Sequence, residues 1–293
     1  MENTKQENPQ TEEKIYNLKN DIIFQAFFAR KGNEQFLIDF LNALLKMDIK
    51  SIEIREEVNL ERLSKEEKGG RLDLQARLED GTIVSIEMQM RDEGYFKERT
   101  IMYAGKVESR ETKKGTKYED ISKIIMINIL GFNMLDVEDY ISETAIVLDK
   151  HRDYEVLNGI KWYFIELPKF RKAKPDMNEK INQWLAFIDD DNKEMVNMAE
   201  NKNETLKKAR IEMNYLTGDA EVRRLAELRE KWEMDRINAI SHATKIGKEE
   251  GIKEGIKEGI IKTAKNLLKM GMTVEQVMDA TGLTKEEIEK INK

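Results

Sequence analysis

The sequence contains no cysteine and only two histidines, His151 and His242, among its 293 residues. Without cysteine the chain has no disulfides, no thiolate nucleophile and no cysteine-ligated zinc or iron–sulfur cluster. The two histidines are far apart in sequence, so a histidine-rich metal site is excluded and ordinary surface positions are expected for both. Any metal is therefore predicted to be a hard cation held by carboxylates.

Long hydrophobic runs are also missing. The longest apolar run, IIMINILGF at residues 124–132, is too short to span a bilayer. Residues 1–14 are polar and acidic without an apolar signal core, and we expect them to form a disordered leader. These features predict a cytoplasmic protein with no membrane association.

Proline and glycine are scarce, with 3 and 16 residues, whereas 37% of the residues are charged. This composition predicts a chain rich in highly charged helices. The 50 basic and 57 acidic residues give a net charge of −7, so the field of the whole molecule does not draw it onto DNA or an anionic membrane. A role with nucleic acid would require a local basic patch or a metal.

Hydrophobic periodicity predicts a mixed α/β or α+β domain over residues 15–175. Helical spacing follows a plausible N-cap at Asn20 and is interrupted once, which indicates two successive helices. The segments after them alternate as strands or repeat as a helix. The expected order is a strand at 51–60, a hairpin at 71–91, a basic helix at 94–114, and three strands at 123–132, 143–148 and 161–167.

After Pro175 the composition changes to almost uninterrupted helix formers, which predicts a helical segment over 176–240 and a separate region over 241–293. The latter begins with a four-residue glycine repeat (Gly247, Gly251, Gly255 and Gly259) and closes with two short helices that start near Thr273 and Thr284. Each glycine costs a helix about 1 kcal/mol. Pairing of the repeat helix, within or between chains, is the expected compensation.

The closing helices admit a second interpretation as a helix-turn-helix DNA reader. Residues 241–293 hold ten lysines and nine acidic residues, which is weak support for a surface that follows phosphates. We therefore favour association of chains, and predict a homo-oligomer formed through this region.

The hairpin carries the most specific pattern in the chain. If Glu79-Asp80-Gly81 is the loop, Leu78 faces Thr82 and Asp73 lies directly opposite Glu87. One face is then polar (Arg71, Asp73, Gln75, Ser85, Glu87 and Gln89) and the other apolar (Leu72, Leu74, Leu78, Val84, Ile86, Met88 and Met90). A two-residue loop would shift the register and separate the two carboxylates.

Opposed carboxylates on neighbouring strands repel each other, so their presence suggests a shared counter-ion. Mg²⁺ fits best, because it accepts a few carboxylates and keeps positions for water and phosphate oxygens. The alternative is a two-sided sheet whose polar face meets solvent, with Arg71 and Arg77 offsetting the acids.

Asp73, separated by thirteen residues from Glu87-Met88-Gln89, resembles the PD-(D/E)XK nuclease core. More narrowly, the chain resembles the recombination-promoting nucleases, also described as transposases. The supporting features are Asp21 to Phe28, Arg99 with Tyr103, Gly115 to Tyr118, and the glycine repeats before GMTVEQVMDATGLTKEEI. The resemblance covers residues 15–293. It implies a restriction-endonuclease-like αβββαβ core, divalent-metal phosphodiester hydrolysis, and a role in DNA recombination or mobile elements.

The resemblance also implies roles for individual residues. Asp73 and Glu87 would bind the metal together with the backbone carbonyl of Met88, and Gln89 occupies the position of the superfamily's lysine. An amide can orient a water molecule but cannot deprotonate it. Asp21 is a candidate further acid near the metal, and its alternative is a carboxylate placed at a helix N-terminus by the macrodipole.

Arg99 and Tyr103 lie four residues apart, hence on one helical face, and the resemblance implies that they contact substrate phosphate. Their helix lies in a local basic patch, with seven basic and three acidic residues over 94–118. Such a patch is required for nucleic-acid binding because the net charge of the whole chain is negative. The alternative places Tyr103 in the core and pairs Arg99 with a surface acid.

These observations predict a Mg²⁺-dependent DNA endonuclease with low sequence specificity, because no base-reading module stands out. Two alternatives belong to other classes. One is a catalytically weak DNA-binding protein that retains the nuclease fold, for which the missing lysine is the best argument. The other is a helical oligomerisation protein that uses the sheet as a scaffold.

Overall fold

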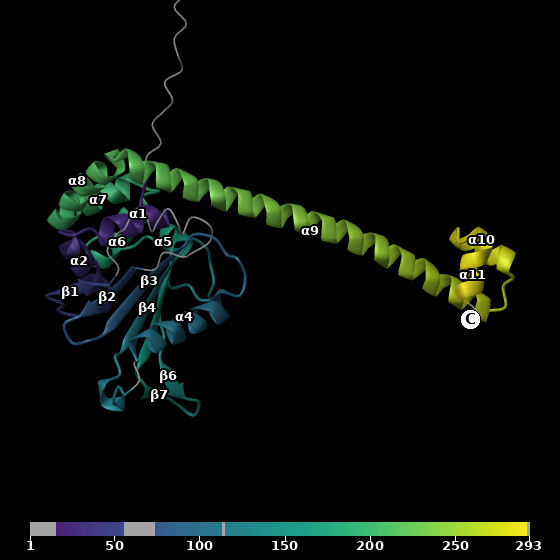
Figure 1. The fold of residues 1–293 in the computed structure, drawn as a ribbon, viewed down its shortest axis with the longest axis horizontal. Helices are drawn as coiled ribbons and strands as arrows, with labels where there is room; N and C mark the ends of the chain where they lie inside the picture. The colour runs from purple at the N-terminus through teal and green to yellow at the C-terminus, as the bar shows by residue number, and fades with distance from the viewer. Residues whose placement is uncertain (1–15, 56–73, 113–114, 292–293) are drawn as a thin grey trace, which may run out of the picture. The chain divides into compact units, whose positions relative to one another are not determined.

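The computed structural model describes residues 16–55, 74–112 and 115–291. It divides into two compact units, Met1–Glu230 and Lys231–Lys293. Figure 1 shows the elements of both units.

The first unit begins with helices α1 (Asp21–Phe28) and α2 (Glu34–Leu45). The side chain of Asn20 accepts hydrogen bonds from the backbone N–H groups of Ile22 and Ile23, at 3.1 and 3.3 Å, which confirms it as the N-cap. Apart from Asp21, every residue of α1 is buried. A helix that is apolar on nearly all sides belongs in the interior, and α1 lies there.

The centre of the unit is a six-stranded mixed sheet in the order β1-β2-β3-β4-β8-β5. The pairs β3–β4 and β4–β8 are parallel, and the other neighbours are antiparallel. Among the described residues two helices, three strands, helix α4 and then β4 follow in chain order, which is the predicted αβββαβ arrangement. The strands are β1 (Ile52–Ile54), β2 (Leu74–Leu78), β3 (Ile83–Gln89), β4 (Ile124–Leu130), β5 (Ile141–Glu143) and β8 (Ile160–Glu166).

The β2–β3 hairpin has the predicted register. Its strands pair from Leu74 with Ile86 to Arg77 with Ile83, and the N–H of Leu78 donates to the carbonyl of Thr82 at 2.8 Å. Gly81 takes a φ of +86°, the conformation that a three-residue loop requires of its last residue. The alternative two-residue loop is thereby excluded. Asp73 and Arg71 lie outside the described residues.

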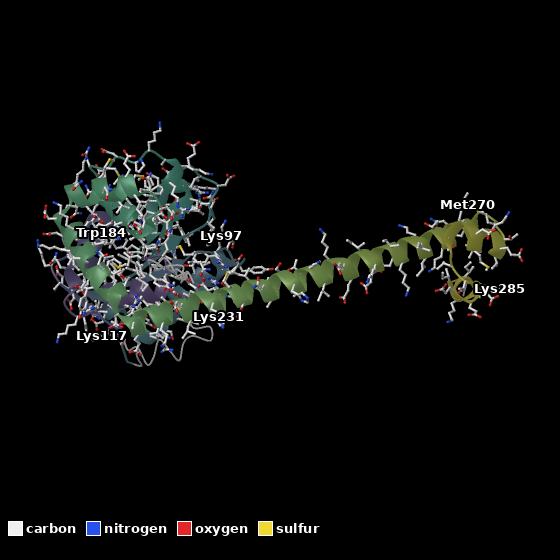
Figure 2. All side chains as sticks on the ribbon, turned by 90° about the horizontal axis from the view of Figure 1, so that it is seen from above. Lys97, Lys117, Trp184, Lys231, Met270 and Lys285 are labelled. Atoms are coloured by element: carbon white, nitrogen blue, oxygen red, sulfur yellow. The ribbon has the colours of Figure 1, made fainter. Side chains whose placement is uncertain are left out.

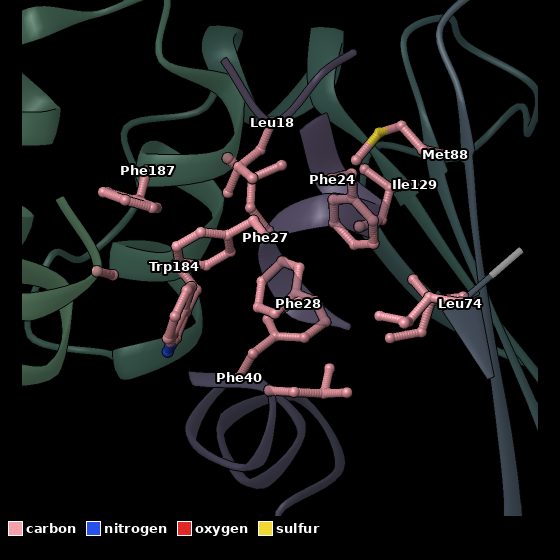
Figure 3. Packing of buried hydrophobic residues seen from close by; sticks show 14 of the residues in the cluster. Leu18, Phe24, Phe27, Phe28, Phe40, Leu74, Met88, Ile129, Trp184 and Phe187 are labelled. Atoms are coloured by element: carbon pink, nitrogen blue, oxygen red, sulfur yellow. The ribbon is translucent and has the colours of Figure 1, made fainter. Parts of the chain in front are cut away.

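The main hydrophobic core lies between the apolar face of this sheet and helices α1, α2 and α6 (Lys180–Asp189). Figure 3 shows Phe28, Phe40 and Trp184 together, with Leu74, Met88 and Ile129 on the sheet side. The ring of Trp184 lies 6.0 Å from those of both Phe28 and Phe40.

The helices after Pro175 belong to the same compact unit as the sheet. Besides α6 these are α7 (Lys193–Lys202) and α8 (Glu204–Gly218). Buried residues from these helices, and from α5 (Leu167–Lys172) just before Pro175, join the main core. The structure therefore divides the chain at Glu230, whereas the sequence predicts boundaries at 175 and 240. The two divisions differ because helix propensity in the sequence does not show which surface a helix covers in the folded chain.

The segment predicted as one strand at 143–148 is split between two sheets. Residue 143 ends β5, whereas β6 (Ile146–Leu148) pairs with β7 (His151–Leu157) in a separate two-stranded ribbon. The sequence analysis does not predict β7. All seven of its residues are exposed, including His151, so it lacks the half-buried alternation that marks a strand in sequence.

The second unit contains the later part of α9 (Ala220–Lys269), α10 (Val274–Thr281) and α11 (Lys285–Ile291). Ala264, Val277 and Ile288 form its small core, one residue from each helix. Thr273 forms a reciprocal capping box with Gln276, and Gly282 closes α10 with a φ of +71°. The predicted short helices are thus confirmed. No helix among the described residues is long and apolar enough to cross a bilayer.

Candidate active site

The polar face of the hairpin is covered by helix α4 (Phe96–Glu111). Ala104 and Val107 of α4 pack on Ile83 of β3 and on residues of β4, and Figure 1 shows α4 beside these strands. Glu87 and Gln89 are only 3% and 7% exposed. The alternative, in which the polar face of the sheet meets solvent, is therefore wrong for the described strands. Helix α4 covers this face, and the hairpin pattern alone does not show that.

Arg99 of α4 lies over Glu87 and Gln89. Its Nη2 is 3.5 Å from Oε1 of Glu87 and 3.3 Å from Oε1 of Gln89, and its Nη1 is 3.2 Å from Oε2 of Glu93. The guanidinium also lies 5.2 Å from the ring of Phe96. A cation so placed compensates a carboxylate that burial would otherwise penalise.

Both ends of the Gln89 amide are used by the protein. Its Oε1 accepts from Arg99, and its Nε2 donates to the backbone carbonyl of Arg91 at 2.6 Å. The group retains one N–H and one lone pair, because an amide has two of each. Gln89 therefore ties together the end of β3, the following loop and Arg99, and still has capacity for a water molecule.

Tyr103 lies one turn after Arg99 on α4 and is half-buried. Its ring packs at the edge of the cluster formed by α4, β3 and β4, and is 5.9 Å from the guanidinium of Arg99 and 5.4 Å from Nζ of Lys106. Both predicted arrangements are partly present. Arg99 is directed at Glu87 in the site and is also paired with Glu93. Tyr103 contacts the apolar cluster and also Arg99.

Asn128 of β4 is a site residue that the sequence analysis does not identify. It is fully buried beside Glu87 in the parallel β3–β4 register. Its Oδ1 accepts from Oγ1 of Thr100 at 3.3 Å, and its Nδ2 donates to the carbonyl of Tyr163 at 3.3 Å. Since Thr100 is adjacent to Arg99, this pair fixes α4 to the sheet at the level of Glu87. The one feature of the sequence that could have identified Asn128 is that it is the single amide in the apolar run IIMINIL.

The remaining predicted metal ligands occupy different surroundings. The side chain of Met88 packs in the main core, so a metal contact from this residue would come from its backbone, as predicted. Asp21 lies in the first turn of α1, and its Oδ2 is 2.6 Å from Nη2 of Arg229. That pairing agrees with the alternative of a helix N-terminal carboxylate, and a metal role for Asp21 stays a prediction.

The donors on this face suit a hard cation. Glu87 offers carboxylate oxygen, Met88 a carbonyl and Gln89 an amide oxygen, which are the ligand types that Mg²⁺ accepts. Within residues 16–55, 74–112 and 115–291, no three Asp, Glu or His side chains gather as a metal cluster. Asp73, the second predicted carboxylate, precedes the first described residue of β2 and lies outside the described set, so its pairing with Glu87 stays a prediction.

The exposed side of α4 has free cations. Neither Lys97 nor Arg110 forms an ion pair with another residue of the described part of the chain, and Figure 2 labels Lys97 at the surface. Glu111, one of the three acids of the segment, is bound by Arg55 and by Nη2 of Arg77, the latter at 2.6 Å. Neutralising that carboxylate makes the helix surface more positive than its sequence count suggests.

A cavity of about 230 Å³ lies elsewhere, lined by residues of α5, α6 and α7 and by the turn between α6 and α7. It contains the ion pair between Arg171 and Asp189, with Nε 2.9 Å from Oδ2. The carboxylate raises the pKa of the Arg171 guanidinium. None of the predicted site residues lines this cavity, so it does not contribute to the candidate active site.

Comparisons with known proteins agree with this geometry. Residues 18–243 match the family described as PD-(D/E)XK nuclease family transposase, and residues 257–293 match the C-terminal helix-turn-helix domain of the Rpn/YhgA-like nuclease family. No curated protein and no solved structure shows a significant match.

The second family match corrects the interpretation of the closing helices. The sequence analysis finds no base-reading module and favours chain association, whereas α10 and α11 lie in a segment that matches a helix-turn-helix domain, a type of domain that implies DNA binding. The balanced charge of the segment concealed this assignment. The first match covers well over half of the sequence and includes the sheet, α4 and every described residue of the candidate site. The chain therefore belongs to the PD-(D/E)XK nuclease family transposases.

Proposed function

We propose that this protein is a cytoplasmic, Mg²⁺-dependent DNA endonuclease with low sequence specificity that acts in recombination or in the movement of mobile elements. The observation that supports the proposal best is the burial of Glu87 beneath Arg99. A carboxylate and a guanidinium under a basic helix offer sites for a cation and for a phosphate within one small region.

In this proposal Asp73, Glu87 and the Met88 carbonyl hold the metal, with Asp21 as a possible further acid. When bound, Mg²⁺ supplies a water of lowered pKa and stabilises the charge that builds on the phosphate and the leaving oxygen. Gln89 orients the attacking water through its remaining hydrogen-bonding capacity, because it cannot act as a base.

Arg99 and Tyr103 act on the substrate in this proposal. Arg99 pairs with Glu87, and its guanidinium would also grip a substrate phosphate. Tyr103 would donate its hydroxyl to a phosphate oxygen. Water adds across one P–O bond, leaving a terminal phosphate and a hydroxyl.

The test is nicking of supercoiled plasmid by the full chain with Mg²⁺ or with EDTA. Glu87→Gln and Asp73→Asn should reduce Mg²⁺-dependent nicking to background, and Arg99→Ala should lower it about 10²- to 10³-fold, as for loss of a group that stabilises transition-state charge. Asp149→Asn is a matched control, because this exposed acid lies in the turn between β6 and β7. Nicking that persists in both site variants would refute the assignment.

Low specificity is supported by the side chains of α11, the second helix of the helix-turn-helix segment. Its exposed residues include Glu286, Glu287 and Glu289, which repel phosphate and offer acceptors only. We expect the helix-turn-helix to add modest affinity without strong base selection.

We also propose self-association through α9, as the second candidate function. Residues 241–259 are exposed throughout, and Ile252 and Ile256 are 53% and 59% exposed. Figure 2 shows the side chains between Lys231 and Met270 projecting from the helix. Deletion of residues 241–293 should lower the oligomeric state in size-exclusion chromatography with light scattering, and an unchanged mass would contradict the proposal.

A further inference from the structure

Tyr95, which directly precedes the helix that carries Arg99, departs from three preferences, namely those for exposure, helix capping and backbone conformation. Its side chain is 83% exposed, which is unusual for an aromatic residue. It occupies the N-cap of α4 without a side-chain cap, where Ser, Thr, Asp or Asn is preferred. Its backbone is left-handed, with a φ of +54°.

The other left-handed residues that are not glycine have an ordinary explanation. Lys46 and Asp190, with φ values of +54° and +52°, are the C-caps of α2 and α6, where helices commonly end in this conformation. Tyr95 instead begins a helix. Nothing in the capping of α4 requires a tyrosine there, and asparagine would suit the left-handed backbone better.

The loop that presents Tyr95 is tied to the site at both ends. The Gln89 amide holds the carbonyl of Arg91, and the side chain of Asp92 accepts from the N–H of Gly94 at 2.8 Å. Glu93 pairs with Arg99, whose own N–H donates to the carbonyl of Tyr95 at 3.1 Å. The ring is therefore held one helical turn from Arg99, outside the buried carboxylate.

No ring contact or side-chain hydrogen bond of Tyr95 occurs within the described part of the chain. Residues 91–98 hold two cations and three acids, so this loop does not attract phosphates. An exposed ring on an anchored backbone, without net positive charge around it, is suited to stacking, which is available with every base. A residue that departs from the local backbone and capping preferences without stabilising the fold is a candidate functional residue.

We propose that Tyr95 stacks on an unpaired base of the DNA next to the phosphate that Arg99 contacts. The inference rests on the proposed nuclease function and adds a substrate class, namely single-stranded or locally opened DNA. In a duplex the base faces are covered by their neighbours, so a ring at this position gains its contact only where a base is unstacked.

The test measures binding by the full chain in EDTA, where cleavage is absent. Single-stranded oligonucleotides carry 2-aminopurine at successive positions, and its fluorescence reports stacking. Tyr95→Ala should weaken binding about 5- to 150-fold, equivalent to about 1–3 kcal/mol for one stacked base, and should abolish quenching at one position. Tyr95→Phe should retain both.

Two further variants make the result specific. Tyr154→Ala removes another exposed ring, 60% accessible, from β7 and should bind as the unmodified chain does. Tyr95→Asn should lose binding as Tyr95→Ala does, yet raise the thermal midpoint by about 2–4 °C, because asparagine suits the left-handed backbone. A tyrosine with a purely structural role would give the opposite change in midpoint.

The outcomes separate this inference from the proposed function. If Tyr95→Ala binds and quenches like the unmodified chain while that chain nicks plasmid, the stacking role is refuted and the nuclease proposal stands. If the unmodified chain neither binds oligonucleotides nor nicks plasmid, both are refuted. Equal loss of binding in Tyr154→Ala would also refute a specific role for Tyr95.

Discussion

At the scale of the residue, Gln89 decides how the site departs from the wider PD-(D/E)XK pattern. By the resemblance it stands where the superfamily has lysine, and its two amide ends hold Arg99 and the carbonyl of Arg91. A lysine would keep a donor but has no acceptor for Arg99. The neighbouring cation thus explains why an amide suits this position.

Restoring the superfamily's lysine should therefore lower activity. Gln89→Lys places an ammonium beside the Arg99 guanidinium and removes its acceptor, so we expect Mg²⁺-dependent nicking to fall about 10- to 100-fold, as for loss of a group that orients a metal ligand. Gln89→Glu keeps the acceptor and should retain more activity than Gln89→Lys. Faster nicking by Gln89→Lys would show that the missing base limits the rate.

Gly131 is required by a close approach of two backbone segments at the end of β4. A Cβ there would lie 2.4 Å from the carbonyl oxygen of Met90, next to Gln89. Gly131→Ala should lower the free energy of unfolding by about 1–3 kcal/mol, because backbone atoms cannot yield as a flexible side chain can. Urea denaturation measures this change.

Gly105 provides the matched control, because it lies inside α4 and a Cβ there would meet nothing within 4 Å. Gly105→Ala should raise the free energy of unfolding by about 0.5–1 kcal/mol through helix propensity alone. Equal effects at the two glycines would contradict the argument from close approach.

At the scale of the element, α11 depends on a cap that responds to pH. Oε2 of Glu287 accepts from the N–H and the hydroxyl of Thr284 at 2.9 and 3.0 Å, and the Thr284 hydroxyl accepts from the N–H of Glu287 at 3.3 Å. These hydrogen bonds lower the pKa of Glu287 from its ordinary 4.5. A lowered pKa means that the charged carboxylate stabilises the folded cap.

The cap's contribution is present above the ordinary pKa of glutamate and is lost as the pH falls through the lowered value. Protection of α11 against hydrogen exchange, corrected for the intrinsic pH dependence of exchange, should therefore decrease on acidification below about pH 4.5. Glu287→Gln keeps an acceptor that does not titrate, and should remove this pH dependence. A variant that retains the same acid transition would assign it to another group.

At the scale of the whole molecule, the helices after Pro175 complete the core of the sheet domain. Trp184 is fully buried against Phe28 and Phe40, and its Nε1 donates to Asp39 of α2 at 2.9 Å. The N-terminal part of α9 contributes as well, since Arg229 pairs with Asp21. Removing these helices would expose the apolar surfaces of α1 and α2.

Truncation after residue 230 should therefore give a folded protein, whereas truncation after residue 175 should not. The chain ending at 230 keeps the whole first unit. The chain ending at 175 loses Trp184 and should lack cooperative thermal unfolding and a near-ultraviolet circular dichroism signal. A cooperative transition in the shorter chain would place the boundary where the sequence alone suggests it.

Much of the architecture could be predicted because it depends on neighbours in sequence. The Asn20 cap, the loop ending at Gly81 and the caps of α10 and α11 use residues within a few positions of one another. The register of β2 and β3 follows from the loop length and the two-residue period of strands. The absence of cysteine and the scarcity of histidine likewise predict that any metal would have oxygen ligands.

What only the tertiary structure decided involves residues far apart in the chain. Thr100 meets Asn128 across 28 positions, and Trp184 reaches Asp39 across 145. The burial of Glu87 depends on α4 packing over a face that looks solvated in the hairpin pattern. The two-residue period of a strand predicts which residues share a face of the sheet. Whether those residues are buried, and whether their charges are compensated, depends on which element covers that face. The sequence by itself therefore determined the elements and the candidate donors, and packing decided which of them are buried together.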